Sequence, residues 1–446
     1  MNPELRRNLW LELTTHRLVA MPVVLFLVFV LFASRNASDW QGAVFSTAVA
    51  MFIVVVHLWG TYKASEAVTD EVRDRTWDWQ RLSALDPWPM TWGKLAGATA
   101  LSWYGASLCV VAMVIAMLGG FERRDLAILV CGLVASGVAV HAAALAGSLQ
   151  ASRKSSKLGH RIGLLFFFPA AAVGLFAIAS AGQERAEAIE WYGRSFEAIR
   201  FYSALAVVFA LWAVLAAYRE MARELRVRLL PWAYPAFALF LAALFGGYGQ
   251  GPVASRTSLA LSGLIVCIGL TYYGLFADVT TAMSLRRIAT HGKAGHWRRL
   301  IEELPLWVTT LALAVPFALW CAQILGDSPV LSLVPKAAAL YPVAVLLLAA
   351  RDCGIYVFFA LGSRARGPEG VTLLYIALLS WIVPAVLAIA GMGAAARLLM
   401  PFGSMNGWQA SVVMGVHVAI VAGLVAWRWR ARRRAFGSMP PASSSG

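Results

Sequence analysis

One compact charged and aromatic stretch interrupts two long apolar runs, and its residue types are suited to binding rather than to catalysis. It reads "KASEAVTDEVRDRTWDWQRLSALDP", from Lys63 to Pro87. If the helix is continuous, Glu71 and Arg75 lie on one face at the favourable i, i+4 spacing, together with Trp79. Charged side chains are costly in a bilayer, so this segment must leave the membrane with one adhesive face exposed.

The second half of the stretch predicts a short separate helix. Thr76 is suited to the N-cap position, and Pro87 and Pro89 are expected to end the helix. A helical hairpin that exposes tryptophan outside the membrane forms a docking surface for another protein. An amphipathic loop lying against lipid headgroups fits the same residues, and the pattern alone does not separate the two.

Catalytic motifs are missing from the sequence. Neither Gly93-Lys94 nor Gly292-Lys293 has the glycine spacing or the following Ser or Thr of a phosphate-binding loop, so the chain has no ATPase motif of its own. No H-E-x-x-H, G-x-S-x-G or paired-acid motif appears either. We therefore expect a chain that is not an enzyme and binds no cofactor.

Histidines and cysteines offer little metal chemistry. His57, His141 and His417 fall in separate apolar runs, where a three-histidine site is conceivable but isolated packing histidines are favoured. The five cysteines are odd in number and never form a C-x-x-C pair, which indicates neither a disulfide framework nor a metal site.

The surrounding composition defines the class of protein. The 446 residues are 60% hydrophobic and only 14% charged, and apolar runs of about 17 to 25 residues match a bilayer core. We predict an all-α polytopic membrane protein of about twelve spans. They are expected near 18–34, 41–60, 93–118, 126–149, 162–181, 201–218, 230–247, 257–277, 304–325, 333–350, 371–391 and 409–427.

Lys and Arg predict the orientation. With a cytoplasmic N-terminus, about 29 of the 38 basic residues lie in cytoplasmic loops or in the tail that follows residue 428. Both termini are therefore expected in the cytoplasm. The net charge of +15 is spread over many short membrane-edge loops, which excludes nucleic acid as the expected partner.

Weak self-similarity predicts a tandem parallel repeat of two six-helix halves. "WQRLSALDP" at Trp79 to Pro87 resembles "WRRLIEELP" at Trp297 to Pro305, and "ELR" at Glu4 recurs at Glu224. An even number of spans per half gives both copies one orientation. The expected halves are residues 1–218 and 219–428, followed by a basic cytoplasmic tail at 429–446.

Each half is expected to begin with an amphipathic interface helix. In 2–17, Asn2 is suited to cap and Pro3 to open the helix. Leu5, Leu9 and Leu13 then line one face. Residues 219–230 have a similar character.

Residues Glu71 to Gly97 resemble the segment between the second and third spans of ABC-2 type transporter permeases. The matching positions are Glu71, Arg73, Thr76, Leu82, Pro87, Gly93 and Lys94. "NPELRRNLW" is similar to the N-terminal interface helix of that family at Asn2, Pro3, Leu5 and Arg6. The resemblance implies coupling segments at 63–92 and 279–303, called here the first and second coupling segments, on which an ATPase subunit docks.

The resemblance further implies a permease component of an exporter in the plasma membrane of a bacterium, the inner membrane. Its partners would be membrane lipid and two copies of the ATPase subunit, which would use ATP and Mg. The implied ATPase-coupling residues are Glu71, Arg73, Arg75, Thr76, Trp79, Arg81, Leu82, Trp297, Arg299 and Leu300. The second segment departs from the pattern because it has no acid at the place of Glu71.

Two alternatives remain open. A secondary transporter of major-facilitator-like parallel organisation would need intramembrane carboxylates for proton coupling, whereas Asp and Glu are predicted at span ends. An intramembrane enzyme would need a catalytic motif. Few polar residues mark a hydrophilic path, which favours a lipid-like or amphipathic substrate. A lipid-facing role for the same apolar residues fits equally well, so the substrate stays open.

Overall fold

The computed structural model describes residues 2–82, 85–117, 123–153, 188–249, 251–278, 280–327, 339–362, 368–402 and 405–437. The described chain is mostly helical, as the composition predicts. It divides into two compact units: Met1–Glu190 with Arg194–Leu229, and Trp191–Gly193 with Leu230–Gly446.

The first unit contains eleven described helical segments, two of them non-α. They are α1 (Pro3–Glu12), α2 (Thr15–Arg35), the 3-10 turn η1 (Ala37–Asp39), α3 (Trp40–Phe52), the π-helical segment η2 (Ile53–Gly60), α4 (Thr61–Arg73), α5 (Trp77–Arg81), α6 (Pro87–Gly97), α7 (Ala100–Ala116), α8 (Arg123–Ser152) and α11 (Ala198–Glu224). A short hairpin of β1 (Ile189–Trp191) and β2 (Arg194–Phe196) precedes α11.

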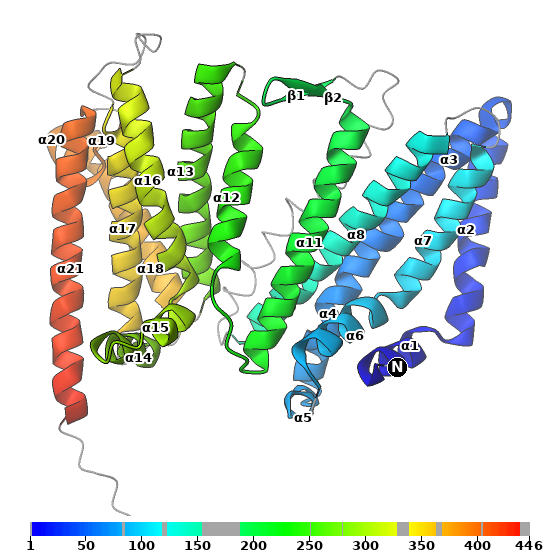
Figure 1. Cartoon of the computed structure of the whole chain (residues 1–446), viewed down its shortest axis with the longest axis horizontal. Helices are drawn as coiled ribbons and strands as arrows, with labels where there is room; N and C mark the ends of the chain where they lie inside the picture. Colours follow the sequence, from blue (N-terminus) through cyan, green and yellow to red (C-terminus); the bar gives the residue numbers. More distant parts are fainter. Residues whose placement is uncertain are drawn as a thin grey trace, which may run out of the picture. The chain divides into compact units, whose positions relative to one another are not determined.

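The described part of the second unit also combines long helices with short ones (Figure 1). They are α12 (Ala233–Gly246), α13 (Pro252–Ala277), α14 (Ala282–Lys293), α15 (Trp297–Glu303), α16 (Leu306–Asp327), α17 (Tyr341–Ala360), α18 (Pro368–Ala377), the π-helical η4 (Leu378–Ile382), α19 (Val383–Ile389), α20 (Gly393–Leu399) and α21 (Gly407–Gly437).

Nine helices in the described residues are long and apolar enough to cross a membrane, and a bent pair makes a tenth if it is one span. This supports a multi-pass membrane protein but not the predicted count of twelve. The bent pair is α6 with α7, at 53°, where a single span was predicted at 93–118. The span predicted at 230–247 is the shorter helix α12, and the span predicted at 162–181 lies outside the described residues.

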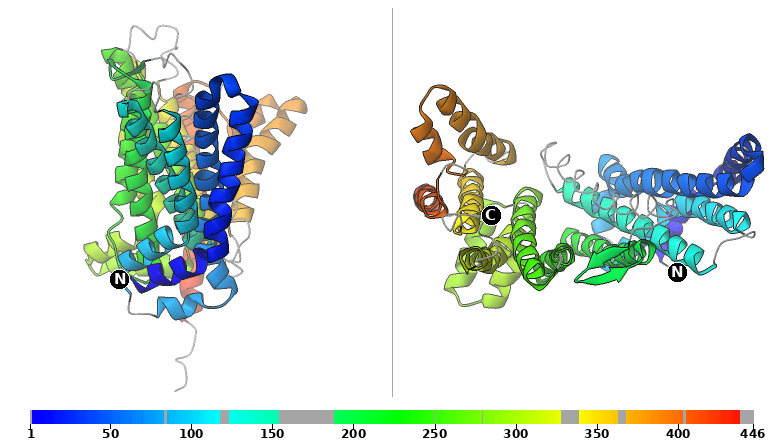
Figure 2. Two further views of the ribbon diagram at one scale, coloured as in Figure 1. Left: turned by 90° about the vertical axis from the view of Figure 1, so that its right-hand side faces the viewer. Right: turned by 90° about the horizontal axis from the view of Figure 1, so that it is seen from above.

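Helix α1 lies across the ends of the long helices instead of running parallel to them (Figure 1; Figure 2, left). The side chain of Asn2 accepts hydrogen bonds from the backbone N–H groups of Glu4 and Leu5, and Pro3 occupies the first helical position, as predicted. The helix ends at Glu12, so Leu13 lies just beyond the helix on which it was expected.

The interface helix predicted at 219–230 is absent as a separate element. Residues 219–224 instead continue α11, and the backbone beyond them is not helical. Glu220, Met221 and Glu224 are buried, so this end of α11 belongs to the packed interior. Arg226 then adopts the left-handed conformation, with φ 57°, and ends the helix.

One core cluster fixes the position of the first coupling segment. Buried side chains from α4, α5, α6, α8 and α11 pack together. They include Val68, Trp77, Met90, Leu145 and Met221. The turn after α4 is therefore attached to the apolar interior of the first unit.

Candidate functional site

The first coupling segment is two helices joined by a tight turn. Helix α4 ends at Arg73, and α5 begins at Trp77. The Asp74 N–H donates to the Asp70 carbonyl at 2.8 Å, and the Thr76 N–H donates to the Glu71 carbonyl at 2.9 Å. This pattern requires a left-handed residue, and Arg75 takes it with φ 60°. The conformation costs a non-glycine residue about 1–2 kcal/mol.

The continuous helical face expected from the sequence is wrong, because this turn separates α4 from α5. Glu71 and Arg75 form no ion pair, because α4 ends at Arg73 and Arg75 takes the left-handed conformation. Thr76 occupies the N-cap position of α5, as predicted, but its hydroxyl donates to the Glu71 carbonyl at 3.3 Å instead of capping. Pro87 opens α6 rather than ending α5, which stops at Arg81.

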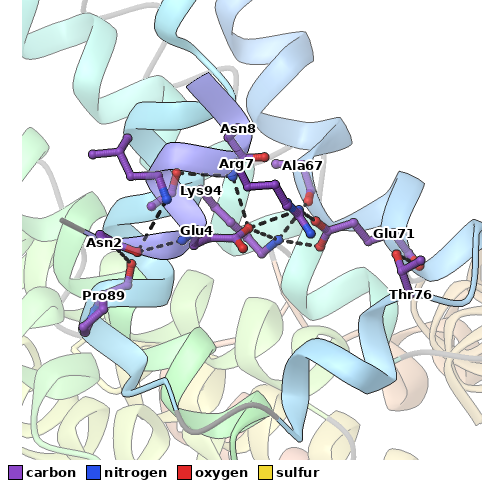
Figure 3. A network of polar contacts seen from close by, with 11 residues as sticks. Asn2, Glu4, Arg7, Asn8, Ala67, Glu71, Thr76, Pro89 and Lys94 are labelled. Carbon is purple, nitrogen blue, oxygen red and sulfur yellow. Dashed lines mark hydrogen bonds and ion pairs between the residues drawn. The ribbon is translucent and has the colours of Figure 1, made fainter. Parts of the chain in front are cut away.

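Glu71 faces inward and joins a cluster of charges with Glu4, Arg7 and Lys94, called here the charge cluster (Figure 3). The Lys94 ammonium is 1% exposed and lies 3.0 Å from the Glu4 carboxylate. It also contacts the Glu71 carboxylate, which pairs with Arg7 as well. The cluster therefore ties α1, α4 and α6 together through one buried cation.

Close packing of α1 on α6 brings these groups together. A Cβ atom at Gly93 would lie 2.7 Å from Cβ of Glu4, so only glycine allows this approach. The Asn2 side-chain amide donates to the Pro89 carbonyl, and the Asn8 amide donates to the Glu4 carboxylate at 3.1 Å. The Gly-Lys pair in the second half of α6 thus has a structural role: Gly93 makes room, and Lys94 supplies the charge.

Two tryptophans on α5 have opposite environments. Trp77 is 4% exposed. The Lys94 ammonium lies over the Trp77 ring, 5.1 Å from the ring centre. Trp79 is 77% exposed, and Leu82 beyond it is exposed as well. Arg73 is also exposed. The outward surface of the first segment is therefore formed by Arg73, Trp79 and Leu82, while Trp77 anchors it.

An arginine-lined cavity of about 660 Å³ opens beside the turn. It is bordered by α4, α5 and the ends of α8 and α11. Its lining residues are Val72, Arg75, Trp77, Asp78, Arg81, Ser152, Arg153, Arg223, Glu224 and Arg226. Arg81, predicted to couple to an ATPase, lies 3.7 Å from the Glu224 carboxylate and borders this cavity.

The second coupling segment has the same backbone turn. Gly295 is left-handed with φ 72°. The Ala294 N–H donates to the Thr290 carbonyl at 3.0 Å, and the His296 N–H donates to the His291 carbonyl at 3.0 Å. Each bond has its counterpart 220 residues earlier, at Asp74 and Thr76. The turn thus aligns Trp297 with Trp77, not with Trp79 as the sequence comparison does.

Side chains around the second turn differ from those around the first. Trp297 is 66% exposed, and Arg299 is exposed. Leu300 is partly buried and lies close to Gly292. The position that corresponds to Glu71 holds His291, which lies 3.8 Å from the Glu303 carboxylate. Arg287 pairs with the same carboxylate at 3.3 Å.

Polar groups also lie inside apolar helices of the first unit. Nε2 of His57, in the π-helical segment η2, is 2.8 Å from the Ser136 hydroxyl. Nε2 of His141 lies 2.8 Å from the Val56 carbonyl. Both contacts join η2 to α8, as expected of histidines that pack between helices. No cluster of three or more His, Cys, Asp or Glu side chains suited to a metal occurs within the described ranges.

The second unit contains a charged pair that the sequence analysis missed. Arg351 and Asp352 lie in the middle of α17, are each 2% exposed, and approach to 2.7 Å. The Tyr272 hydroxyl donates to Asp352 at 2.7 Å, and Arg351 donates to Ser380 at 2.7 Å. The span was predicted at 333–350, so both charges were placed beyond its end.

Comparison with known proteins identifies no relative of this chain. No family model matches the chain, and neither a curated protein nor a solved structure matches it. Function is therefore argued from the residues and their arrangement.

Proposed function

We propose that this chain is the membrane-spanning permease component of an ATP-binding cassette exporter of the ABC-2 type. A separate ATPase subunit would dock on the first and second coupling segments. The observation that carries the proposal is the first turn: it is clamped to α1 and α6 by Lys94, while Trp79 and Leu82 project outward.

A docking element that transmits movement needs a rigid connection to the transmembrane helices. Lys94 bridges carboxylates on α1 and α4, and Trp77 fills the core beneath the turn. Removing one member of a buried charge network leaves its partners unpaired, at a cost of about 3–5 kcal/mol. The connection is therefore stiff, whereas the exposed tryptophan is free to bind.

Two turns of the same backbone geometry support two docking sites. Both place an exposed tryptophan on the short helix that follows the turn, Trp79 on α5 and Trp297 on α15. The first site has a buried anchor and the second does not. We therefore expect one chain to engage two ATPase copies, with unequal strength.

The test is co-expression of this chain with a candidate ATPase subunit, followed by co-purification of the two. Trp79→Ala should reduce the ATPase recovered per permease, since exposed aromatic anchors often contribute about 2 kcal/mol or more at interfaces. Trp297→Ala should reduce recovery less. Trp408→Ala is the matched control, because Trp408 is exposed but lies at the start of α21, outside both segments.

Full recovery of the ATPase in both Trp79→Ala and Trp297→Ala would contradict the proposal. If a crosslinker placed at residue 79 reached lipid headgroups and not the ATPase, the segment would be an amphipathic element lying against headgroups.

A secondary transporter is the second candidate, and the buried Arg351–Asp352 pair favours it. An intramembrane carboxylate is a common element of proton coupling, and Asp352 has the central position that the sequence did not predict. The purified chain in vesicles that enclose a pH-sensitive dye provides the test. A proton flux that is lost in Asp352→Asn would support the carrier, and its absence would support the permease.

A further inference from the structure

The arginine-lined cavity beside the first turn has the composition of an anion site. We propose that it binds a phosphate group, carried either by an anionic phospholipid headgroup or by a soluble phosphate compound. Guanidinium groups match phosphate oxygens through paired N–H donors. The cavity, at about 660 Å³, has room for a phosphate with an attached group.

The balance of charge around the cavity is positive. Five arginines line it: Arg75, Arg81, Arg153, Arg223 and Arg226. The carboxylates within reach are Asp78 and Glu224 in the lining, and Glu220, which pairs with Arg153 and Arg223. Five cations against three anions leave an excess of two positive charges. A phosphate group supplies the missing negative charge.

Arg75 and Arg226 carry this excess. Neither forms an ion pair with another described residue, whereas Arg81, Arg153 and Arg223 are shared among the carboxylates. Arg75 and Arg226 follow two separate helix ends, those of α4 and α11, and both line this cavity. They are the side chains available to a ligand.

The backbone at these two arginines supports a binding role. Both occupy the left-handed position of a helix-ending turn, with φ 60° at Arg75 and 57° at Arg226. Glycine is the residue that such a position favours, and the second coupling segment has Gly295 there. Arginine at two unfavourable positions that face one cavity indicates that the side chain serves a purpose there.

A buried donor in the cavity wall gives an independent indication of a ligand. Trp77 lines the cavity and is more than nine-tenths buried, and its indole N–H has no acceptor among the described residues. Buried donors are nearly always paired, so an acceptor from outside the chain is expected. A phosphate oxygen or a water bound to it would provide that acceptor.

The experiment measures ligand binding to the purified full-length chain by native mass spectrometry. The probes are inorganic phosphate, short-chain phosphatidic acid and, as the comparison with no net charge, short-chain phosphatidylcholine. Arg75→Gly and Arg226→Gly remove the side chain but suit the left-handed backbone, so their melting temperatures should stay level or rise. Each should weaken phosphatidic acid binding about tenfold, and the double variant about a hundredfold.

Arg228→Gly is the matched control, because Arg228 is exposed two residues from Arg226 but does not line the cavity. Tighter binding of phosphatidic acid than of inorganic phosphate would identify a headgroup, and equal binding would identify a soluble phosphate compound. Failure of both probes to bind, unchanged binding in the double variant, or an equal loss in Arg228→Gly would overturn the proposal. Because the isolated chain is used, the result is separate from any result with an ATPase.

Discussion

The two coupling segments have one backbone and two different supports. In both, a helix ends through the same hydrogen bonds to a left-handed residue, Arg75 in the first and Gly295 in the second. The tryptophan that follows by two positions is buried in the first segment and exposed in the second. The turn is thus determined locally, whereas its attachment depends on residues distant in the sequence.

The difference arises from what lies beneath each turn. Below the first, Lys94 and Glu4 come from α6 and α1 to meet Glu71. Within the described part of the second unit, α14 has no buried residue, and its Arg287 and His291 approach Glu303 of the same segment. The two turns therefore share one backbone shape, whereas their connections to the long helices differ.

The largest expected effect comes from removing the buried cation. Lys94→Met should lower the unfolding free energy of the first unit by about 3–5 kcal/mol, because Glu4 and Glu71 lose their buried cation and keep only the more exposed Arg7. Thermal unfolding followed by size-exclusion chromatography would measure it. Lys293→Met is the control: Lys293 is exposed on α14, and its loss should leave the melting temperature unchanged. Equal melting temperatures for both variants would remove the contrast.

Truncating the two aligned tryptophans tests the contrast at one position of the turn. Trp77→Ala should cost about 3–5 kcal/mol, the usual range for a buried aromatic side chain. Trp297→Ala should cost less than about 0.5 kcal/mol, since exposed substitutions away from packed groups are nearly neutral. The same thermal measurement applies. A larger loss in Trp297→Ala would show that the second turn is anchored too.

The sequence predicts part of this arrangement because part of it is local. The Asn2 cap, the Pro3 position and the helix start after Thr76 depend on neighbouring residues and are found. The direction of Glu71 depends on Lys94, 23 residues away. A helical wheel of this segment alone does not contain Lys94 and therefore predicts that Glu71 lies on the exposed face.

Burial was predicted least well where element boundaries were wrong. Placing a span at 333–350 moved Asp352 outside the helix, whereas α17 runs from Tyr341 to Ala360. Residues 219–224 look amphipathic because Glu220 and Glu224 are charged, yet both pair with Arg153 inside the unit. A charged residue predicts exposure only until a partner is found for it.

Substitutions at the two left-handed residues, Arg75 and Gly295, test whether the two turns have the same backbone conformation. Arg75→Gly should stabilise the first unit by about 0.5–1 kcal/mol, because glycine relieves the strained conformation. Gly295→Ala should destabilise the second by about 1 kcal/mol through backbone strain alone, since a Cβ atom there meets nothing within 4 Å. Opposite signs of the change in melting temperature would confirm the equivalence.

The smallest expected effect concerns Glu303, which takes the place of the charge cluster in the second segment. Its carboxylate pairs with Arg287, whose side chain is mostly exposed, and approaches His291. Exposed ion pairs are worth about 0–1 kcal/mol and weaken with salt. Glu303→Gln should therefore change thermal stability by no more than that amount, and high salt should abolish the difference.

Glu71→Gln, measured in parallel, should keep a clear destabilisation at high salt, because its partner Lys94 is buried and poorly screened. If both variants lost their effect in salt, the charge cluster would be a surface feature, and the distinction between an anchored and an unanchored turn would fail.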